Sequence, residues 1–160
     1  ITDKHPELVR CADSAILDNH RQAQCEAAIF SWDDAASPVA AQRYDLILAA
    51  DCLYSSGTTG AFCDALALLV DRAPEEAAAE DAGRTPRVIV SCGERWSKDE
   101  CMDICREHGW DFRRLGDVRT PSEYHLSQLH QRALEHGLST WVYEMSRREG
   151  GEKAGPVVVA

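Results

Sequence analysis

The feature that most constrains the fold of this chain is a near-continuous apolar run over residues 44–51, YDLILAAD. Such a segment places apolar residues on both of its faces, because apolar and polar residues do not alternate along it. This is typical of a strand in a parallel sheet that helices cover on both sides. Residues 87–92, RVIVSC, predict a second buried strand. Two such strands indicate an α/β domain, in which helices pack on a central sheet.

Helical and strand-like segments alternate along the rest of the chain. Apolar spacing predicts three helices, over 7–17, 60–71 and 98–108. Pro6 suits the first turn of the first helix and Asn19 its end, and Gly109 stops the third helix. The first helix is expected to bury a face made of Leu8, Cys11, Ala12, Ala15 and Ile16, and the second a stripe made of Phe62, Ala65, Leu66 and Leu69. Shorter strands are predicted over 26–32, 110–115 (an edge strand) and 140–145. The last two lack a full helical crossover, which permits an antiparallel pair. This order predicts a Rossmann-like, doubly wound, mostly parallel sheet with a C-terminal antiparallel hairpin.

The length of 160 residues suits one domain with a single core. We expect that domain over residues 1–146. The acidic segment 73–86 is expected to be a mobile loop, the polar segment 117–138 an inserted loop, and the Gly- and charge-rich segment 147–160 a disordered tail.

The composition indicates which partners and which cellular compartment we expect for this protein. A net charge of −10 repels phosphate backbones, so the sequence argues against nucleic-acid binding. It could favour a basic protein partner, although acidity more often serves solubility. No apolar run approaches the roughly 20 residues of a membrane helix. Seven cysteines, an odd number, favour a reducing cytosol or nucleus over a disulfide framework. We expect a monomer.

Ligands of an open α/β sheet bind beyond the carboxyl ends of the strands, so the residues that follow each apolar run are the candidates for chemistry. Asp51 follows the long apolar run, and Tyr54 lies on the same side if a helical turn starts there. Trp32 and Asp33 could bracket an adenine, although a Trp at a strand end is as often part of the core. Asp3 could accept both hydroxyls of a ribose. The local sequence favours a different role for Asp3 over ribose binding, namely that it caps the helix that begins near Pro6.

Taken together, these segments resemble the family-16 methyltransferases, seven-β-strand class I enzymes that use S-adenosylmethionine and include many protein lysine methyltransferases. The resemblance rests on Thr2-Asp3, Trp32-Asp33 and residues 44–54, which end in the family's most specific motif, Asp51-x-x-Tyr54. It extends to about Tyr143, weakly after Gly57, and Arg95 lies where the family often carries an Arg.

The resemblance implies a role for each matching residue. Asp3 would bind the ribose of S-adenosylmethionine, Trp32 and Asp33 would border the adenine, and Ala50 would line the methionine part. Asp51 and Tyr54 would shape the entrance for an acceptor amine, with a protein lysine as the expected acceptor and no dedicated general base. The family's glycine-rich loop has no counterpart in this sequence, so the first βα unit is expected to be missing.

Other functions are weaker alternatives. An acidic strand end also occurs in P-loop ATPases, but the chain has no Gly-rich loop followed by Lys-Ser or Lys-Thr. A nicotinamide-dependent dehydrogenase would explain Asp3 but not the Asp-x-x-Tyr motif. A non-catalytic scaffold that keeps a truncated methyltransferase fold is the main alternative. Cys101, Cys105 and His108 share a helical face, but no fourth metal ligand is evident, so we expect no metal site.

Overall fold

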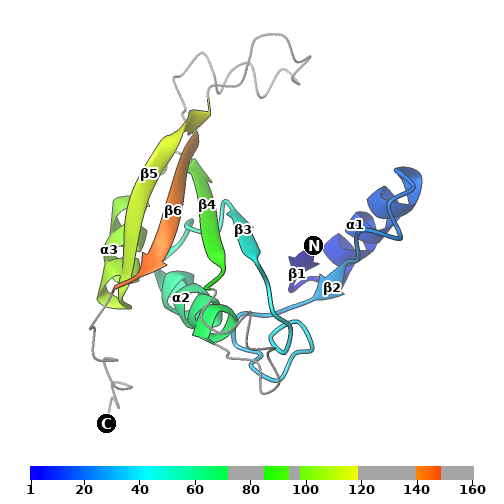
Figure 1. Ribbon diagram of the computed structural model, residues 1–160, viewed down its shortest axis with the longest axis horizontal. Helices are drawn as coiled ribbons and strands as arrows, with labels where there is room; N and C mark the ends of the chain where they lie inside the picture. Colours follow the sequence, from blue (N-terminus) through cyan, green and yellow to red (C-terminus); the bar gives the residue numbers. More distant parts are fainter. Residues whose placement is uncertain (72–84, 94–97, 119–139, 149–160) are drawn as a thin grey trace.

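The computed structural model describes residues 1–71, 85–93, 98–118 and 140–148, and the fold is α/β (Figure 1). Four strands form the main sheet in the order β3-β4-β6-β5, and two very short strands form a second sheet, β1-β2. The strands are β1 (Thr2–Asp3), β2 (Ala28–Ile29), β3 (Leu46–Ala50), β4 (Arg87–Gly93), β5 (Trp110–Val118) and β6 (Thr140–Arg147). The helices are α1 (Pro6–Asp18), α2 (Ser56–Asp71) and α3 (Lys98–Glu107).

The sheet is mixed in the way the sequence predicts. Strands β3 and β4 are parallel, and so are β1 and β2. Strands β5 and β6 form the predicted antiparallel hairpin, and β6 also pairs antiparallel with β4. The second strand of the hairpin therefore lies inside the sheet, and β5 is an edge strand as its alternating sequence predicts.

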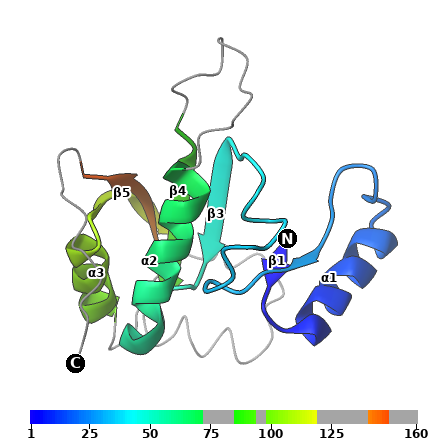
Figure 2. The ribbon, with the colours of Figure 1, turned by 90° about the horizontal axis from the view of Figure 1, so that it is seen from below.

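The main core lies on one face of the four-stranded sheet, where α2 and α3 pack side by side (Figure 2). Strand β4 has the period-2 burial of a strand with one covered face, with Val88, Val90 and Cys92 almost fully buried. The predicted stripe of α2 is divided between two clusters: Phe62 and Leu66 are buried in this one, whereas Ala65 and the partly buried Leu69 belong to a second. This second cluster joins α2 to residues 28–44 through Phe30, Val39, Ala40 and Ala65.

The opposite face of β3 departs from the sequence prediction. Leu46 and Leu48 are 48% and 71% exposed, whereas Ile47 and Ala49 pack against the core. We predicted that helices cover both faces of this strand, and in the described part of the chain they cover one. The reason is the position of α1, which contacts β1 and β2 and lies beyond the free edge of β3 (Figures 1 and 2).

Helix ends follow the sequence closely. Helix α1 begins at Pro6 and ends at the cap residue Asn19, whose side-chain amide donates to the carbonyl of Ala15 at 2.7 Å. Helix α3 stops before Gly109, which has the left-handed φ of 80° that favours glycine. The predicted buried face of α1 is wrong in part, because Val9 and Ile16 are buried while Leu8 is 52% exposed.

Several sequence predictions fall outside the described residues. Most of the acidic segment 73–86, most of the segment 117–138, Arg95 and the tail after Arg148 lie there. Several boundaries differ from the prediction: β2 is shorter than 26–32, α2 begins four residues before Gly60, β5 extends to Val118 and β6 to Arg147.

Candidate active site

The electrostatic environment of the Cys52 thiol includes carboxylates from the ends of two strands, β1 and β3. Burial is the main cause that raises the pKa of this thiol from 9.0 to about 11, and the negative charges of Asp51 and Asp3 add to it. Asp3 ends β1 and Asp51 follows β3 directly, so two carboxylates 48 positions apart in sequence act on one side chain. The predicted cofactor residue Asp3 and the predicted acceptor residue Asp51 therefore both contribute to the electrostatics of one thiol.

Asp51 has an uncommon backbone conformation. Its φ is 57°, in the left-handed region where Asp and Asn are the most tolerated residues after Gly. Its N–H donates to the carbonyl of Ser91 on β4 at 2.7 Å, which ties the turn to the neighbouring strand. Strain of this kind persists only where the surroundings fix it, and it is concentrated at functional sites. The side chain of Asp51 is exposed.

A buried side chain in the middle of the segment between Asp51 and α2 anchors this segment in the core. Leu53 is fully buried in the main core, while Tyr54 is 43% exposed. The sequence places Tyr54 on the same side as Asp51 only if a helical turn starts there, and no such turn forms because α2 begins at Ser56. The carbonyl of Ser55 accepts the N–H groups of Thr58 and Thr59 at 3.2 and 3.1 Å, which starts the helix. A buried Leu53, rather than a helical turn, fixes where Tyr54 emerges.

The prediction that Asp3 caps α1 is wrong, because His5 is the N-cap residue and no side chain caps the first turn. The Oδ1 atom of Asp3 accepts the backbone N–H of His5 at 2.8 Å, just ahead of α1. A carboxylate has two oxygens, so this bond leaves Oδ2 for a hydroxyl group. The bond to His5 orders the turn ahead of α1 and is compatible with ligand binding at this residue.

Trp32 and Asp33 lie after β2 and have different surroundings. The ring of Trp32 packs on Phe62 of α2, with centroids 5.1 Å apart, and the residue is only partly buried. Asp33 is exposed and accepts a hydrogen bond from the hydroxyl of Ser31. That bond is the largest cause that lowers the pKa of Asp33, and the charge of Lys4, next to Asp3, contributes. The loop after β2 therefore lies near the end of β1.

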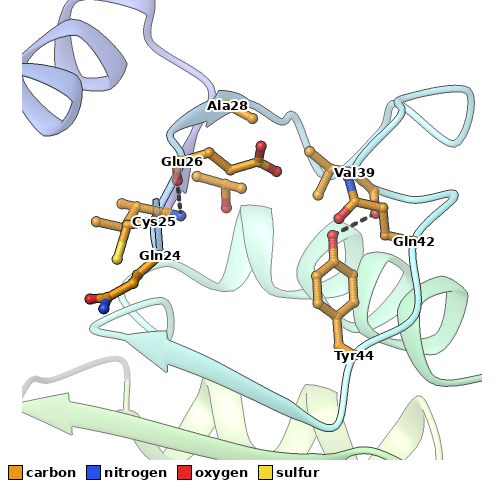
Figure 3. A pocket seen from close by; sticks show the side chains of 9 residues that line it. Gln24, Cys25, Glu26, Ala28, Val39, Gln42 and Tyr44 are labelled. Carbon is orange, nitrogen blue, oxygen red and sulfur yellow. Dashed lines mark hydrogen bonds between the residues drawn. The ribbon is translucent and has the colours of Figure 1, made fainter. Parts of the chain in front are cut away.

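A separate pocket of about 290 Å³ lies at the opposite, amino-terminal end of β1 and β2 (Figure 3). Its lining includes Glu26, Gln42 and Tyr44, and the Tyr44 hydroxyl donates to the carbonyl of Val39 at 2.8 Å. Burial and the charge of Glu26 raise the pKa of Tyr44. None of the predicted site residues lines this pocket, so it is distinct from the site around Cys52.

The cysteines and histidine that share a face of α3 have other partners. The Sγ atom of Cys105 lies 3.3 Å from that of Cys63, and Nδ1 of His108 lies 3.3 Å from a carboxylate oxygen of Asp64. Within the described ranges, no group of three or more potential metal ligands comes together. None of the helices described has the length and hydropathy of a membrane span.

The protein is an α/β protein whose candidate residues lie at or just after the carboxyl ends of β1, β2 and β3. The sequence matches the lysine methyltransferase family over residues 1–101, more than half of the chain. The chain belongs to this family, and it is thereby an S-adenosylmethionine-dependent methyltransferase by class. The resemblance seen in the sequence is confirmed.

Comparisons with solved structures and with curated proteins give less information about this chain than the family match does. A similar solved structure is that of a protein from Galdieria sulphuraria named as a sarcosine dimethylglycine methyltransferase. The identity is 14%, the TM-score is 0.48, and the alignment covers 92% of this chain and 68% of that chain. A similarity of this size carries no conclusion about the substrate. No curated protein matches the sequence.

Sequence reasoning missed Cys52 and Ser31. Cys52 stands inside the Asp51-x-x-Tyr54 motif, but only the fold shows that the charge of Asp3 helps to raise its pKa. The Ser31-x-Asp33 spacing could have indicated the hydrogen bond, because a hydroxyl two residues before a carboxylate often meets it in a turn.

Proposed function

We propose that this chain is a protein-lysine N-methyltransferase whose site is built from Asp3, Trp32, Asp33, Ala50, Asp51 and Tyr54. The observation that supports the proposal is the match to the lysine methyltransferase family over residues 1–101, together with the position of Asp3 at the end of β1 and of Asp51 directly after β3. A methyltransferase has to hold its cofactor and its acceptor side by side. The carboxylates of Asp3 and Asp51, from different strands, both raise the pKa of Cys52, so they lie within electrostatic range of one thiol.

The residues around β1 and β2 fit the nucleoside of S-adenosylmethionine. The Asp3 carboxylate keeps Oδ2 for a ribose hydroxyl, and the hydroxyl of Ser31 holds the Asp33 carboxylate. Trp32 is anchored on Phe62 and presents the rest of its surface as an aromatic border for adenine. Ala50, exposed at the end of β3, is small enough to let the methionine part pass close to the backbone.

Asp51 and Tyr54 are assigned to the acceptor. The bound cofactor supplies a methyl group on a sulfonium, and the protein has to orient an amine in line with it. The exposed Asp51 carboxylate attracts a lysine ammonium and lets its proton leave to solvent, while the Tyr54 ring borders the alkyl chain. The net charge of −10 favours a basic protein substrate in the same way.

All seven cysteines are free thiols, as expected of a protein in the cytosol or nucleus, the compartments we propose. We propose a protein substrate and a monomeric enzyme.

The test combines cofactor binding with methyl transfer. S-adenosylhomocysteine is titrated calorimetrically into the wild type, into Asp3→Asn and into Asp13→Asn, a control that removes an exposed carboxylate from α1. We expect Asp3→Asn to weaken binding by roughly tenfold or more, because a charged acceptor for a hydroxyl is lost. Asp13→Asn should bind as the wild type does.

Labelled S-adenosylmethionine is then incubated with a cell lysate, and the modified residues are mapped by mass spectrometry. Label on lysine side chains that disappears with Asp51→Asn supports the proposal. Label on another nitrogen would keep the methyltransferase and refute the lysine. Absence of both binding and label would favour the non-catalytic scaffold.

A further inference from the structure

Helices α2 and α3 bring two cysteines into contact in the core. The Sγ atoms of Cys63 on α2 and Cys105 on α3 lie 3.3 Å apart, and both residues are at most 1% exposed. A disulfide bond length is about 2.05 Å, so a closure of roughly 1.3 Å would join them. Side-chain rotation supplies a movement of that size, since the two helices already pack on each other.

Polar contacts at the ends of both helices fix this geometry. Arg147 of β6 donates to the Asp71 carboxylate at the end of α2 at 2.9 Å and to the carbonyl of His108 after α3 at 3.2 Å. The His108 ring also approaches Asp64 of α2. One strand therefore holds the ends of both helices, so the two thiols meet in a defined arrangement.

We propose that Cys63 and Cys105 are a redox-active pair that peroxide oxidises to an intramolecular disulfide linking α2 to α3. The inference is independent of the proposed acceptor, and its test uses neither cofactor nor substrate. The tether would fix the helix that begins at Ser56, two residues after Tyr54.

The two thiols differ in reactivity in the way that such a pair needs. Cys63 donates its S–H hydrogen bond to Cys105, which lowers the pKa of Cys105 and raises that of Cys63, and the charge of Arg106 also lowers the former. We assign Cys105 as the attacking thiolate, because its Sγ atom accepts the hydrogen bond from the Cys63 thiol at 3.3 Å. It displaces hydroxide from hydrogen peroxide and becomes a sulfenic acid. The sulfur of Cys63 then attacks the Cys105 sulfur, the S–O bond breaks, and the second oxygen leaves as water.

Overall, two thiols and one hydrogen peroxide give one disulfide and two water molecules. Because both sulfur atoms are buried, the reagent reaches them through local openings of the short helix α3, so oxidation should be slower than at the exposed Cys11 and Cys25.

The experiment is a map of disulfides in the folded wild-type protein. The protein is treated with hydrogen peroxide, remaining thiols are alkylated after denaturation, and peptides are identified before and after reduction with dithiothreitol. We expect a crosslinked peptide pair containing Cys63 and Cys105 that dithiothreitol releases. Peroxide treatment that leaves both thiols alkylatable, or that joins either one to a different cysteine, would overturn the proposal.

Two variants test the order of the steps. In Cys63→Ala the resolving thiol is absent, so dimedone should trap Cys105 as a sulfenic acid, whereas in Cys105→Ala the Cys63 thiol should remain reduced. Cys101→Ala, equally buried one turn earlier on α3, is the matched control and should form the disulfide as the wild type does. Sulfenic acid trapped at Cys63 instead of Cys105 would refute the assigned roles. If a variant does not fold, the wild-type map still decides the proposal.

Discussion

The pKa of Cys52 offers a direct test of whether the candidate site is assembled as described. Burial is the largest of the three causes that raise this pKa from 9.0 to about 11, followed by Asp51 and then Asp3. Because the contributions fall in that order, Asp51 can supply at most about half of the increase and Asp3 at most about a third. We therefore predict that Asp51→Asn lowers the pKa to a value no lower than about 10, and that Asp3→Asn lowers it by a smaller amount.

The assay is the rate of alkylation of Cys52 as a function of pH, followed by mass spectrometry of the peptide that contains it. Iodoacetamide reacts with the thiolate, so the midpoint of the profile reports the pKa. Circular dichroism at each pH ensures that only folded protein is compared. At a fixed pH below the midpoint, Asp51→Asn should react up to about threefold faster, because a tenfold rise in thiolate is partly offset by its lower nucleophilicity.

The matched control is Asp45→Asn, which removes a carboxylate just before the opposite end of β3 and should leave the profile unchanged. Asp3→Asn is the decisive variant, because Asp3 lies in β1 and acts on Cys52 only if the ends of β1 and β3 meet. A profile for Asp3→Asn that coincides with those of the wild type and Asp45→Asn would refute the assembled site. The assignment of cofactor and acceptor residues to one place would fail with it.

Two further predictions concern stability. Leu53→Ala should lower the free energy of unfolding, measured in urea, by about 2–5 kcal/mol, because the side chain of a fully buried leucine is lost. The control Leu17→Ala, at a position that is 55% exposed, should change this free energy by less than about 1 kcal/mol. Equal losses in the two variants would contradict the anchoring role of Leu53. The pKa of Glu144 is lowered by hydrogen bonds from Arg87 and Arg113, so its contribution to stability is present above its ordinary pKa of 4.5 and is lost as the pH falls through the lowered value. Glu144→Gln should therefore flatten the dependence of the unfolding free energy on pH below about 4.5, as measured by urea titrations at a series of pH values, and an unchanged slope would count against this ion-pair cluster.

The fold was largely predictable from local patterns. Apolar runs marked β3 and β4, and Pro6, Asn19 and Gly109 marked helix ends, because each of these signals depends on near neighbours in sequence. The exposure of Leu48 was not predictable in this way. An apolar residue on a strand is buried only if another element covers it, and α1 packs on the small sheet instead.

The candidate site was likewise predictable only in the part that depends on neighbouring residues in the sequence. The sequence identified the carboxylates, because a polar residue directly after an apolar strand has to lie where the strand ends. It could not show that the charges of Asp3 and Asp51 both act on Cys52, since that effect depends on how β1 is placed beyond the edge of β3. The supposed helical turn from Asp51 to Tyr54 was wrong for a related reason. The burial of Leu53 fixes this segment, and local helical preference does not.

Asp51 shows why an acidic residue suits this position for two separate reasons. Its left-handed backbone excludes most side chains without strain, and its carboxylate supplies the charge proposed for the acceptor. Asn tolerates the same conformation, so Asp51→Asn removes the charge and keeps the backbone. Ala lacks that tolerance, and Asp51→Ala would remove the charge and also strain the bond from Asp51 N–H to Ser91. If methyl transfer depends on the carboxylate, both variants lose activity, and only Asp51→Ala should also lose stability, by about 1 kcal/mol. If activity follows stability instead, the residue serves the turn, and the acceptor role belongs elsewhere in the site.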